Sequence, residues 1–293
     1  RYANIEEKSE TFFILANGLT RALHYKLVET LEVRNIDFSE ECRIDRLYLA
    51  VIPSLEPYQV VVNGPRFNVK PVDVVMDEHG NTYALFEGLT VRPRDRLMIT
   101  VSYEVELRAL KFTECGIAQL PKYKYEYPSE VMRYLMPSHG VESDSPEIIS
   151  VANSVTRGVE DLWGKIHAIL KFVDSWLTYD ESVPRDLSAL EAYHLRRGVC
   201  EQYARLFVAM CRAIGIPARV VRGFGLLDVE PGVVHESSIL HAWAQVYVPD
   251  CGWLPIEVQS PRLFGVTPMG HIAFVWGEDA TKVNNDEVSP TLY

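Results

Sequence analysis

Several features that would assign this chain to a common class of protein are missing from its sequence. No stretch of 18 or more consecutive apolar residues occurs, so nothing predicts a membrane-spanning helix. Basic residues are outnumbered, with 29 Lys and Arg against 40 Asp and Glu, and the net charge of −11 argues against a nucleic-acid-binding protein. Five cysteines in 293 residues are too few for a disulfide scaffold. Because five is an odd number, at least one thiol is free or paired with another molecule.

Motifs for metals and nucleotides are missing as well. The sequence has no C-x-x-C, no H-E-x-x-H and no close His/Cys pair, so we expect no metal site and no cofactor. Gly223-Phe224-Gly225 precedes no helix and does not indicate a phosphate-binding loop. The acidic segment Asp228–Gly232 is more typical of a solvated loop than of a calcium site. The remaining histidines and cysteines are scattered: Cys115, His139, His167, His194, His235, Cys251 and His271.

The first part of the chain, residues 1–112, has the pattern of short β-strands. Every second residue between Leu97 and Leu107 is apolar, which is typical of a strand with one buried face. Cys42 stands alone here and is expected to be a core thiol. Short strands at this spacing predict an antiparallel β-sandwich. Further strands are expected at Arg46–Ile52, Tyr58–Val62, Val74–Met76 and Thr82–Phe86, the last two joined by a turn at Asp77–Asn81.

The remainder of the chain predicts a linker followed by an α+β domain. Residues 113–144 are rich in proline and tyrosine, so we expect a linker that packs on the domain covering residues 145–293. Helical periodicity predicts helices over Pro146–Thr156, Glu160–Leu177 and Glu201–Ile214. The period then changes to two residues, which indicates an antiparallel sheet. Its expected strands are Ala218–Phe224, His241–Val248, Trp253–Val258 and His271–Trp276.

Cys200 lies where a loop meets the third predicted helix. The N-terminus of a helix carries a partial positive charge and unpaired backbone N–H groups, which stabilise a thiolate and can bind an oxyanion. The other cysteine of this helix, Cys211, lies on the same face about 16 Å away along the axis, given 1.5 Å per residue. The two sulfurs therefore cannot share a metal or a disulfide, and Cys211 is expected in the core.

The two strands that follow place a histidine and a carboxylate on one face of the sheet. His241, Trp243 and Tyr247 alternate with small aliphatic residues, and so does Glu257 on the next strand. If the aliphatic residues share a face, cross-strand partners must sum to an even number, and pairing Tyr247 with Trp253 across the turn satisfies this condition. Glu257 then lies diagonal to His241 at about 7 Å, a gap that the two side chains can cross. A thiol, a histidine and a carboxylate are the parts of an activated cysteine nucleophile.

Four sequence blocks in this order resemble the core of the transglutaminase-like superfamily. They are Gly198–Ala204, Gly215–Gly223, His241–Trp243 and Gly252–Glu257, preceded by Trp176–Tyr179. The resemblance covers Asp144 to Gly277. It implies a papain-like α+β fold, in which the nucleophile begins a central helix and the histidine and acid lie on adjacent strands.

The resemblance also implies roles for individual residues. Cys200 is the implied nucleophile, His241 the general base and acid, and Glu257 the third member. The family usually has Asp-Pro-Thr where this chain has Glu257-Val258-Gln259, and Asp250 in the preceding turn is a fallback acid. An oxyanion or cleft role is considered for Tyr179, Gln202 and Trp243.

The sequence therefore favours a cysteine enzyme that acts on an amide bond of a peptide or protein through an acyl-thioester. A peptidase or amidase is favoured over an acyltransferase. The alternative is a catalytically inactive binding or scaffold protein that retains the fold, and the β-sandwich could recruit a protein or glycan partner. A cytoplasmic location is slightly favoured, with export as the alternative if a signal before Arg1 was removed.

Overall fold

The structure is a computed structural model. It describes residues 2–15, 18–112, 127–225, 234–237, 240–249, 251–278, 281–283 and 286–288. The expectations for Cys115, Asp250 and the acidic segment 228–232 lie outside these residues, and so does the first part of the predicted linker.

Two antiparallel sheets make up the N-terminal region, with strand orders β11-β1-β2-β7-β4 and β3-β6-β5. Their apolar faces meet in one hydrophobic cluster, where Val101 and Tyr103 of β7 join Tyr83 and Phe86 of β6. The predicted sandwich is therefore confirmed. Its strands are β1 (Tyr2–Leu15), β2 (Gly18–Arg34), β3 (Cys42–Ala50), β4 (Gln59–Phe67), β5 (Asp73–Met76), β6 (Thr82–Val91), β7 (Arg96–Arg108) and, from much later in the chain, β11 (Val234–Ser237).

Helices follow the sandwich. The three predicted helices are present, together with two short ones: Ser129–Met132, and one that begins after Ser188, whose side chain forms a capping box with Glu191. A serine followed three residues later by a glutamate is a known start signal, so this helix could have been predicted. The elements are α1 (Ser129–Met132), the 3₁₀ turn η3 (Arg133–Leu135), α2 (Pro146–Val155), α3 (Leu162–Trp176), α4 (Ala189–Leu195) and α5 (Cys200–Ala213).

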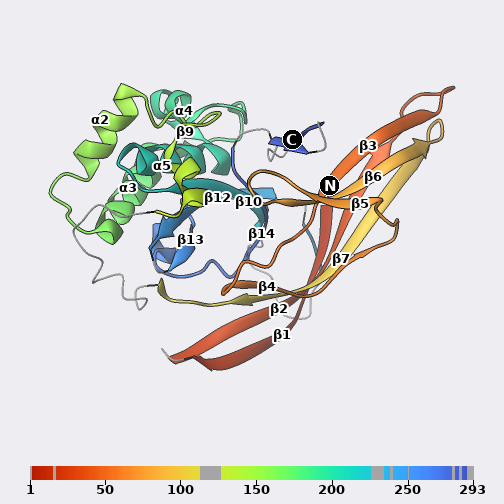
Figure 1. The fold of residues 1–293 in the computed structure, drawn as a ribbon, viewed down its shortest axis with the longest axis horizontal. Coiled ribbons are helices and arrows are strands. Elements are labelled where there is room, and N and C mark those ends of the chain that lie inside the picture. The colour runs from red at the N-terminus through yellow and green to blue at the C-terminus, as the bar shows by residue number, and fades with distance from the viewer. Residues whose placement is uncertain are drawn as a thin grey trace.

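A four-stranded sheet with the order β13-β12-β10-β14 lies between the helices and the sandwich (Figure 1). Tyr247 pairs with Trp253, as the alternation predicts. The aliphatic side chains of β10, β12 and β13 pack with α5 in one core. The sheet comprises β10 (Ala218–Gly225), β12 (Leu240–Val248), β13 (Gly252–Ile256) and β14 (His271–Trp276). Smaller elements are β8 (Thr178–Tyr179), β9 (Arg197–Gly198), η4 (Pro261–Leu263), β15 (Thr281–Val283) and β16 (Asp286–Val288).

Two amide side chains of the sandwich hydrogen-bond to the backbone of β14. Gln59 donates to the Ala273 carbonyl at 2.9 Å and accepts from the Ala273 N–H at 2.8 Å. Asn81 makes the same pair with Trp276, at 2.8 and 2.9 Å. The sandwich thus occupies the outer edge of β14 as a further strand would, and it fixes the position of the strand that begins at His271.

Individual expectations about burial are met in part. Cys211 is buried in the core as predicted. The prediction for Cys42 is wrong, because this residue is the first of β3 and lies exposed at the end of the sheet.

The described part of the predicted linker packs on the strands β12 and β13: the Tyr127 ring lies 6.2 Å from the Tyr247 ring, and the Tyr134 ring lies 5.0 Å from the Trp253 ring. No helix in the described part of the chain has the length and hydropathy needed to cross a bilayer.

Candidate active site

Cys200 is the first residue of α5 and is partly exposed. The chain enters the helix through Gly198, where a Cβ atom would lie 2.4 Å from Cβ of Gln202, so a side chain cannot be accommodated there. The sulfur therefore sits at the N-terminus of a 14-residue helix, where unpaired N–H groups and the helix dipole favour a negative charge.

The start of α5 is held against the sheet by buried charges. Glu201 accepts hydrogen bonds from Arg222 of β10 and, at 3.0 Å, from Arg205 one turn further along the helix. Burial alone would raise the pKa of Glu201, but the two guanidinium groups outweigh it and the pKa is lowered. A charged glutamate next to Cys200 thus fixes the helix start relative to β10, the neighbour of the strand that carries His241.

His241 lies near the start of β12, between the sulfur and a carboxylate. Its Nε2 atom is 2.7 Å from Oε2 of Glu257. The same imidazole lies close enough to Cys200 for that side chain to raise the pKa of His241. Since Nε2 is engaged by the carboxylate, Nδ1 is the nitrogen left to face the sulfur. The structure thus brings Cys200, His241 and Glu257 together, with His241 between the thiol and the carboxylate.

The ionisation of the site follows from these contacts. Burial alone would lower the pKa of His241, but hydrogen bonds to Cys200 and Glu257 and the negative charge of Glu257 raise it to about 10. Burial would likewise raise the pKa of Glu257, yet the hydrogen bonds from His241 and His271 hold it well below its usual range. The arrangement therefore stabilises an imidazolium between a sulfur and a carboxylate.

The structure adds His271, which the sequence pattern left among the scattered histidines. Its Nε2 atom lies 2.5 Å from Oε2 of Glu257, the same oxygen that contacts His241, and its side chain is buried. His271 is the first residue of β14, two strands away from His241 in the sheet. No spacing signal could have identified it, because only the strand order β12-β10-β14 brings the two imidazoles together.

The three residues considered for an oxyanion or cleft role have different surroundings. Tyr179 is half-exposed and close enough to Cys200 for the charge of the sulfur to help burial raise the pKa of Tyr179. Gln202 is fully buried, and its amide donates to the carbonyls of Arg185 and Leu187, so the oxyanion interpretation of this side chain is corrected: it fixes the preceding loop.

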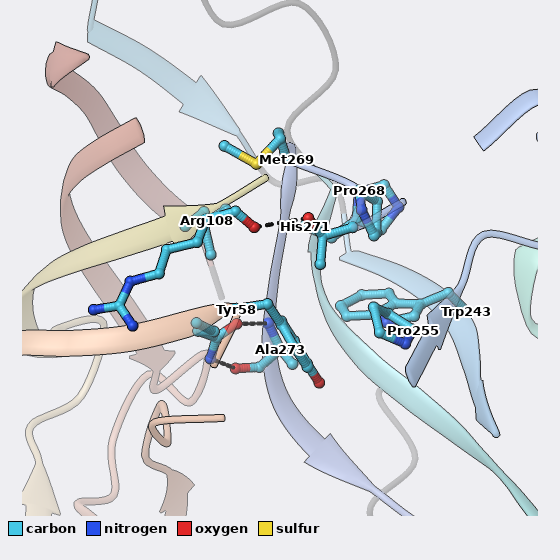
Figure 2. Close-up of a pocket in the computed structure, with 11 residues that line it drawn as sticks. Tyr58, Arg108, Trp243, Pro255, Pro268, Met269, His271 and Ala273 are labelled. Atoms are coloured by element: carbon cyan, nitrogen blue, oxygen red, sulfur yellow. Dashed lines mark hydrogen bonds between the residues drawn. The ribbon is translucent and has the colours of Figure 1, made fainter. Parts of the chain in front are cut away.

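Trp243 is buried. Its ring is stacked on His241 at 5.9 Å and contacts His271 edge-on at 4.9 Å, so it packs behind the two imidazoles. A cavity of about 10 Å³ lies beyond it, between the sandwich and the sheet. Figure 2 shows Trp243 and Pro255 on one side of this cavity and Arg108 on the other. This volume admits one water molecule at most, so the cavity is too small for a substrate.

His241, Glu257 and His271 also have the chemistry of metal ligands, with ligand atoms within 4.8 Å of one another. The two nitrogen–oxygen distances of 2.7 and 2.5 Å, however, are hydrogen-bond lengths. Neighbouring ligand atoms around a tetrahedral Zn²⁺ at 2.0–2.1 Å would be about 3.3 Å apart. The cluster as it stands is therefore a hydrogen-bonded carboxylate, and a metal would have to spread all three side chains.

Comparison with known proteins identifies the region that carries this site. The family model described as transglutaminase-like superfamily matches residues 149–258. Among solved structures, the crystal structure of a candidate cysteine protease from Cytophaga hutchinsonii superimposes on this chain with a TM-score of 0.59 at 16% sequence identity. The match covers 94% of this chain and 82% of that one. At this identity the superposition shows a common fold.

Two curated relatives match parts of the chain. Uncharacterized protein YebA of Bacillus subtilis is 23% identical over 154 residues, which are 47% of this chain and 21% of the relative. A protein-glutamine gamma-glutamyltransferase of Pseudomonas aeruginosa is 36% identical over 69 residues, 22% of this chain and 10% of the relative. The chain thus corresponds to about a fifth of the length of the first protein and a tenth of the second.

Proposed function

This chain contains a transglutaminase-like core, and from that premise we propose that it is a cysteine enzyme that cleaves amide bonds of peptides or proteins through an acyl-thioester. The observation that carries the proposal is the grouping of Cys200, at the N-terminus of α5, with His241 and the Glu257 carboxylate that His241 contacts. Each member has the surroundings that its role requires: a partly exposed sulfur, an imidazole beside it, and a buried carboxylate behind the imidazole.

The steps follow from the order of the three side chains. His241 takes the thiol proton on Nδ1, and the sulfur of Cys200 attacks the amide carbonyl carbon. The carbonyl oxygen becomes an oxyanion, for which the backbone N–H of Cys200 at the helix start is the proposed donor. His241 then gives its proton to the leaving nitrogen, the carbon–nitrogen bond breaks, and the acyl group stays on sulfur. Glu257 holds the ring orientation and stabilises its positive charge throughout.

Hydrolysis is the proposed fate of the acyl-thioester: His241 removes a proton from water, the hydroxyl adds to the carbonyl carbon, and the thiol leaves with that proton. Transfer to a primary amine is the second candidate, and the match to a protein-glutamine gamma-glutamyltransferase favours it. Both reactions use the same three residues. They differ only in which nucleophile reaches the thioester.

The experiment incubates the protein with casein in the presence and absence of a fluorescent primary amine. New peptide amino-termini, or ammonia released without amine incorporation, indicate hydrolysis, whereas covalent fluorescence indicates transfer. Cys200→Ala should abolish either signal, and Cys42→Ala is the matched control because Cys42 is exposed and far along the chain from the site. Activity that survives Cys200→Ala would contradict the proposal.

The binding-only alternative makes a different prediction for the thiol itself. An enzyme nucleophile beside an imidazolium should react with iodoacetamide near neutral pH much faster than an ordinary exposed thiol. Cys42 in the same molecule is such a thiol. If peptide mapping shows Cys200 reacting no faster than Cys42, the activated-thiol mechanism fails and a binding role is favoured.

A further inference from the structure

We propose that His271 is a positioning residue that holds the Glu257 carboxylate and, through it, the ring of His241. The active site would then be a chain of four residues, Cys200–His241–Glu257–His271. This inference rests on the proposed role of Cys200 and deepens it, because it assigns the part of the site that fixes the orientation of the general base.

The first support is the way in which both oxygens of Glu257 are held. Oε2 lies 2.7 Å from Nε2 of His241 and 2.5 Å from Nε2 of His271, while Oε1 accepts from the backbone N–H of Gln259 at 2.9 Å. The three contacts come from three separate segments of the chain. Without His271, the only contact left on Oε2 among the described residues would be His241 itself, the group that the carboxylate has to orient.

The second support is a pair of glycines on the intervening strand. On β10, Gly223 pairs with His241 of β12 and Gly225 pairs with His271 of β14. A Cβ on Gly225 would lie 2.8 Å from Cβ of His241, and one on Gly223 would lie 2.0 Å from the Ile272 carbonyl oxygen and 2.7 Å from the Trp243 ring. The missing side chains let the imidazoles meet across β10, with ring centroids 4.9 Å apart. This gives the Gly223-Phe224-Gly225 motif a structural role.

The third support is the charge balance of the site. The groups that face Glu257 are His241 from β12 and His271 from β14, and those that face His241 are Cys200 from α5 together with Glu257 and His271. Burial lowers the pKa of His271, so this ring is neutral at pH 7 and donates an N–H without adding a charge. It can therefore fix the carboxylate while leaving its negative charge to stabilise the His241 imidazolium.

The test compares His271→Phe with His271→Gln by the rate of Cys200 alkylation with iodoacetamide across pH. Phe keeps a ring packed on Trp243 but removes the donor, and Gln restores a neutral N–H of similar reach. We expect Phe to slow Cys200 alkylation about tenfold, the lower end of losses for residues that orient a reacting ligand. In the plot of alkylation rate against pH, the acid limb of His271→Phe should also lie at higher pH than that of the wild type, because losing a donor raises the pKa of Glu257. Gln should restore both the rate and the limb.

The exposed Cys42 serves as the internal control, because its alkylation should be the same in all three proteins. A purely structural role would lower the melting temperature without moving the acid limb. The proposal is overturned if folded His271→Phe retains the wild-type rate and limb, or if His271→Gln is as impaired as His271→Phe. If Cys200 of the wild-type protein reacts no faster than Cys42, the proposed function is overturned as well. That result comes from the wild type and the others come from the His271 variants, so failure of the function can be told from failure of this inference.

Discussion

At the scale of the residue, His241 is the group on which the site depends. It sits between a sulfur and a carboxylate, and the carboxylate belongs to a glutamate where the transglutaminase-like superfamily, which this region resembles, usually has an aspartate. The longer side chain has a use here, because Oε2 of Glu257 meets both His241 and His271. The departure from the family pattern is thus matched by a second imidazole that the longer acid can reach.

The titration of His241 gives a prediction at this scale. Its pKa is raised from an ordinary 6.5 to about 10, so we expect the midpoint of its ring-proton NMR titration to lie far above that of His167, whose pKa burial lowers. Because folding raises the pKa, the protonated ring stabilises the fold fully below pH 6.5, and this contribution is lost as pH rises through about 10. Urea unfolding across that range should show the loss.

Two variants check the cause of this shift. Glu257→Gln and Cys200→Ala each remove a group that raises the pKa of His241, so each should lower the midpoint and flatten the alkaline loss of stability. A wild-type midpoint at or below 6.5 would mean that burial wins over the two partners, and that the imidazolium is not the resting form of the ring.

At the scale of the element, β10 combines two tasks. Arg222 binds Glu201 and thereby holds the start of α5, while Gly223 and Gly225 leave room for side chains from the strands on either side. The alternation of apolar residues predicted this strand and its neighbours. It could not predict that β10 would lie between β12 and β14, because strand order depends on the packing of the whole sheet.

Gly225→Ala tests the spacing at β10. The new Cβ would lie 2.8 Å from Cβ of His241, an atom that cannot swing away, so we expect a loss of about 1–3 kcal/mol in unfolding free energy from overpacking. The displaced ring should also slow Cys200 alkylation. Gly252→Ala in β13 is the control, because its φ of 77° strains the backbone but no atom lies within 4 Å of the new Cβ. It should cost stability, by about 1–2 kcal/mol, without changing the alkylation rate.

At the scale of the whole molecule, the sandwich and the four-stranded sheet share a hydrophobic cluster. Phe224, Ile272 and Phe274 of the core sheet pack with the buried residues of β2 and β7. Gln59 and Asn81 add paired hydrogen bonds to the backbone of β14. The sandwich thus protects an edge strand and supports the segment that begins at His271.

Asn81→Leu and Gln59→Leu test this coupling. Each leaves a buried N–H and carbonyl of β14 unpaired, and we expect a loss of about 1–3 kcal/mol for each unpaired group by urea unfolding. Asn153→Leu on the exposed face of α2 is the matched control and should change stability little. If Gln59→Leu also slows alkylation of Cys200, the edge of β14 and the site are coupled. A Gln59→Leu protein as stable as Asn153→Leu would show that the sandwich does not support the core.

The sequence by itself indicated Cys200, His241 and Glu257 through the blocks that resemble the transglutaminase-like superfamily. Local periodicity indicated the helix near the cysteine and the strands β12 and β13, and the parity of strand pairing permitted their observed register, because these signals act over short separations. Only the tertiary structure decided that His271 meets Glu257 and that the Gln202 amide is hydrogen-bonded to carbonyls of the preceding loop. Only the tertiary structure gave the glycines of β10 a role. These contacts cross strands that are not adjacent in sequence, so they depend on the order in which the sheet assembles and on the packing of side chains around it.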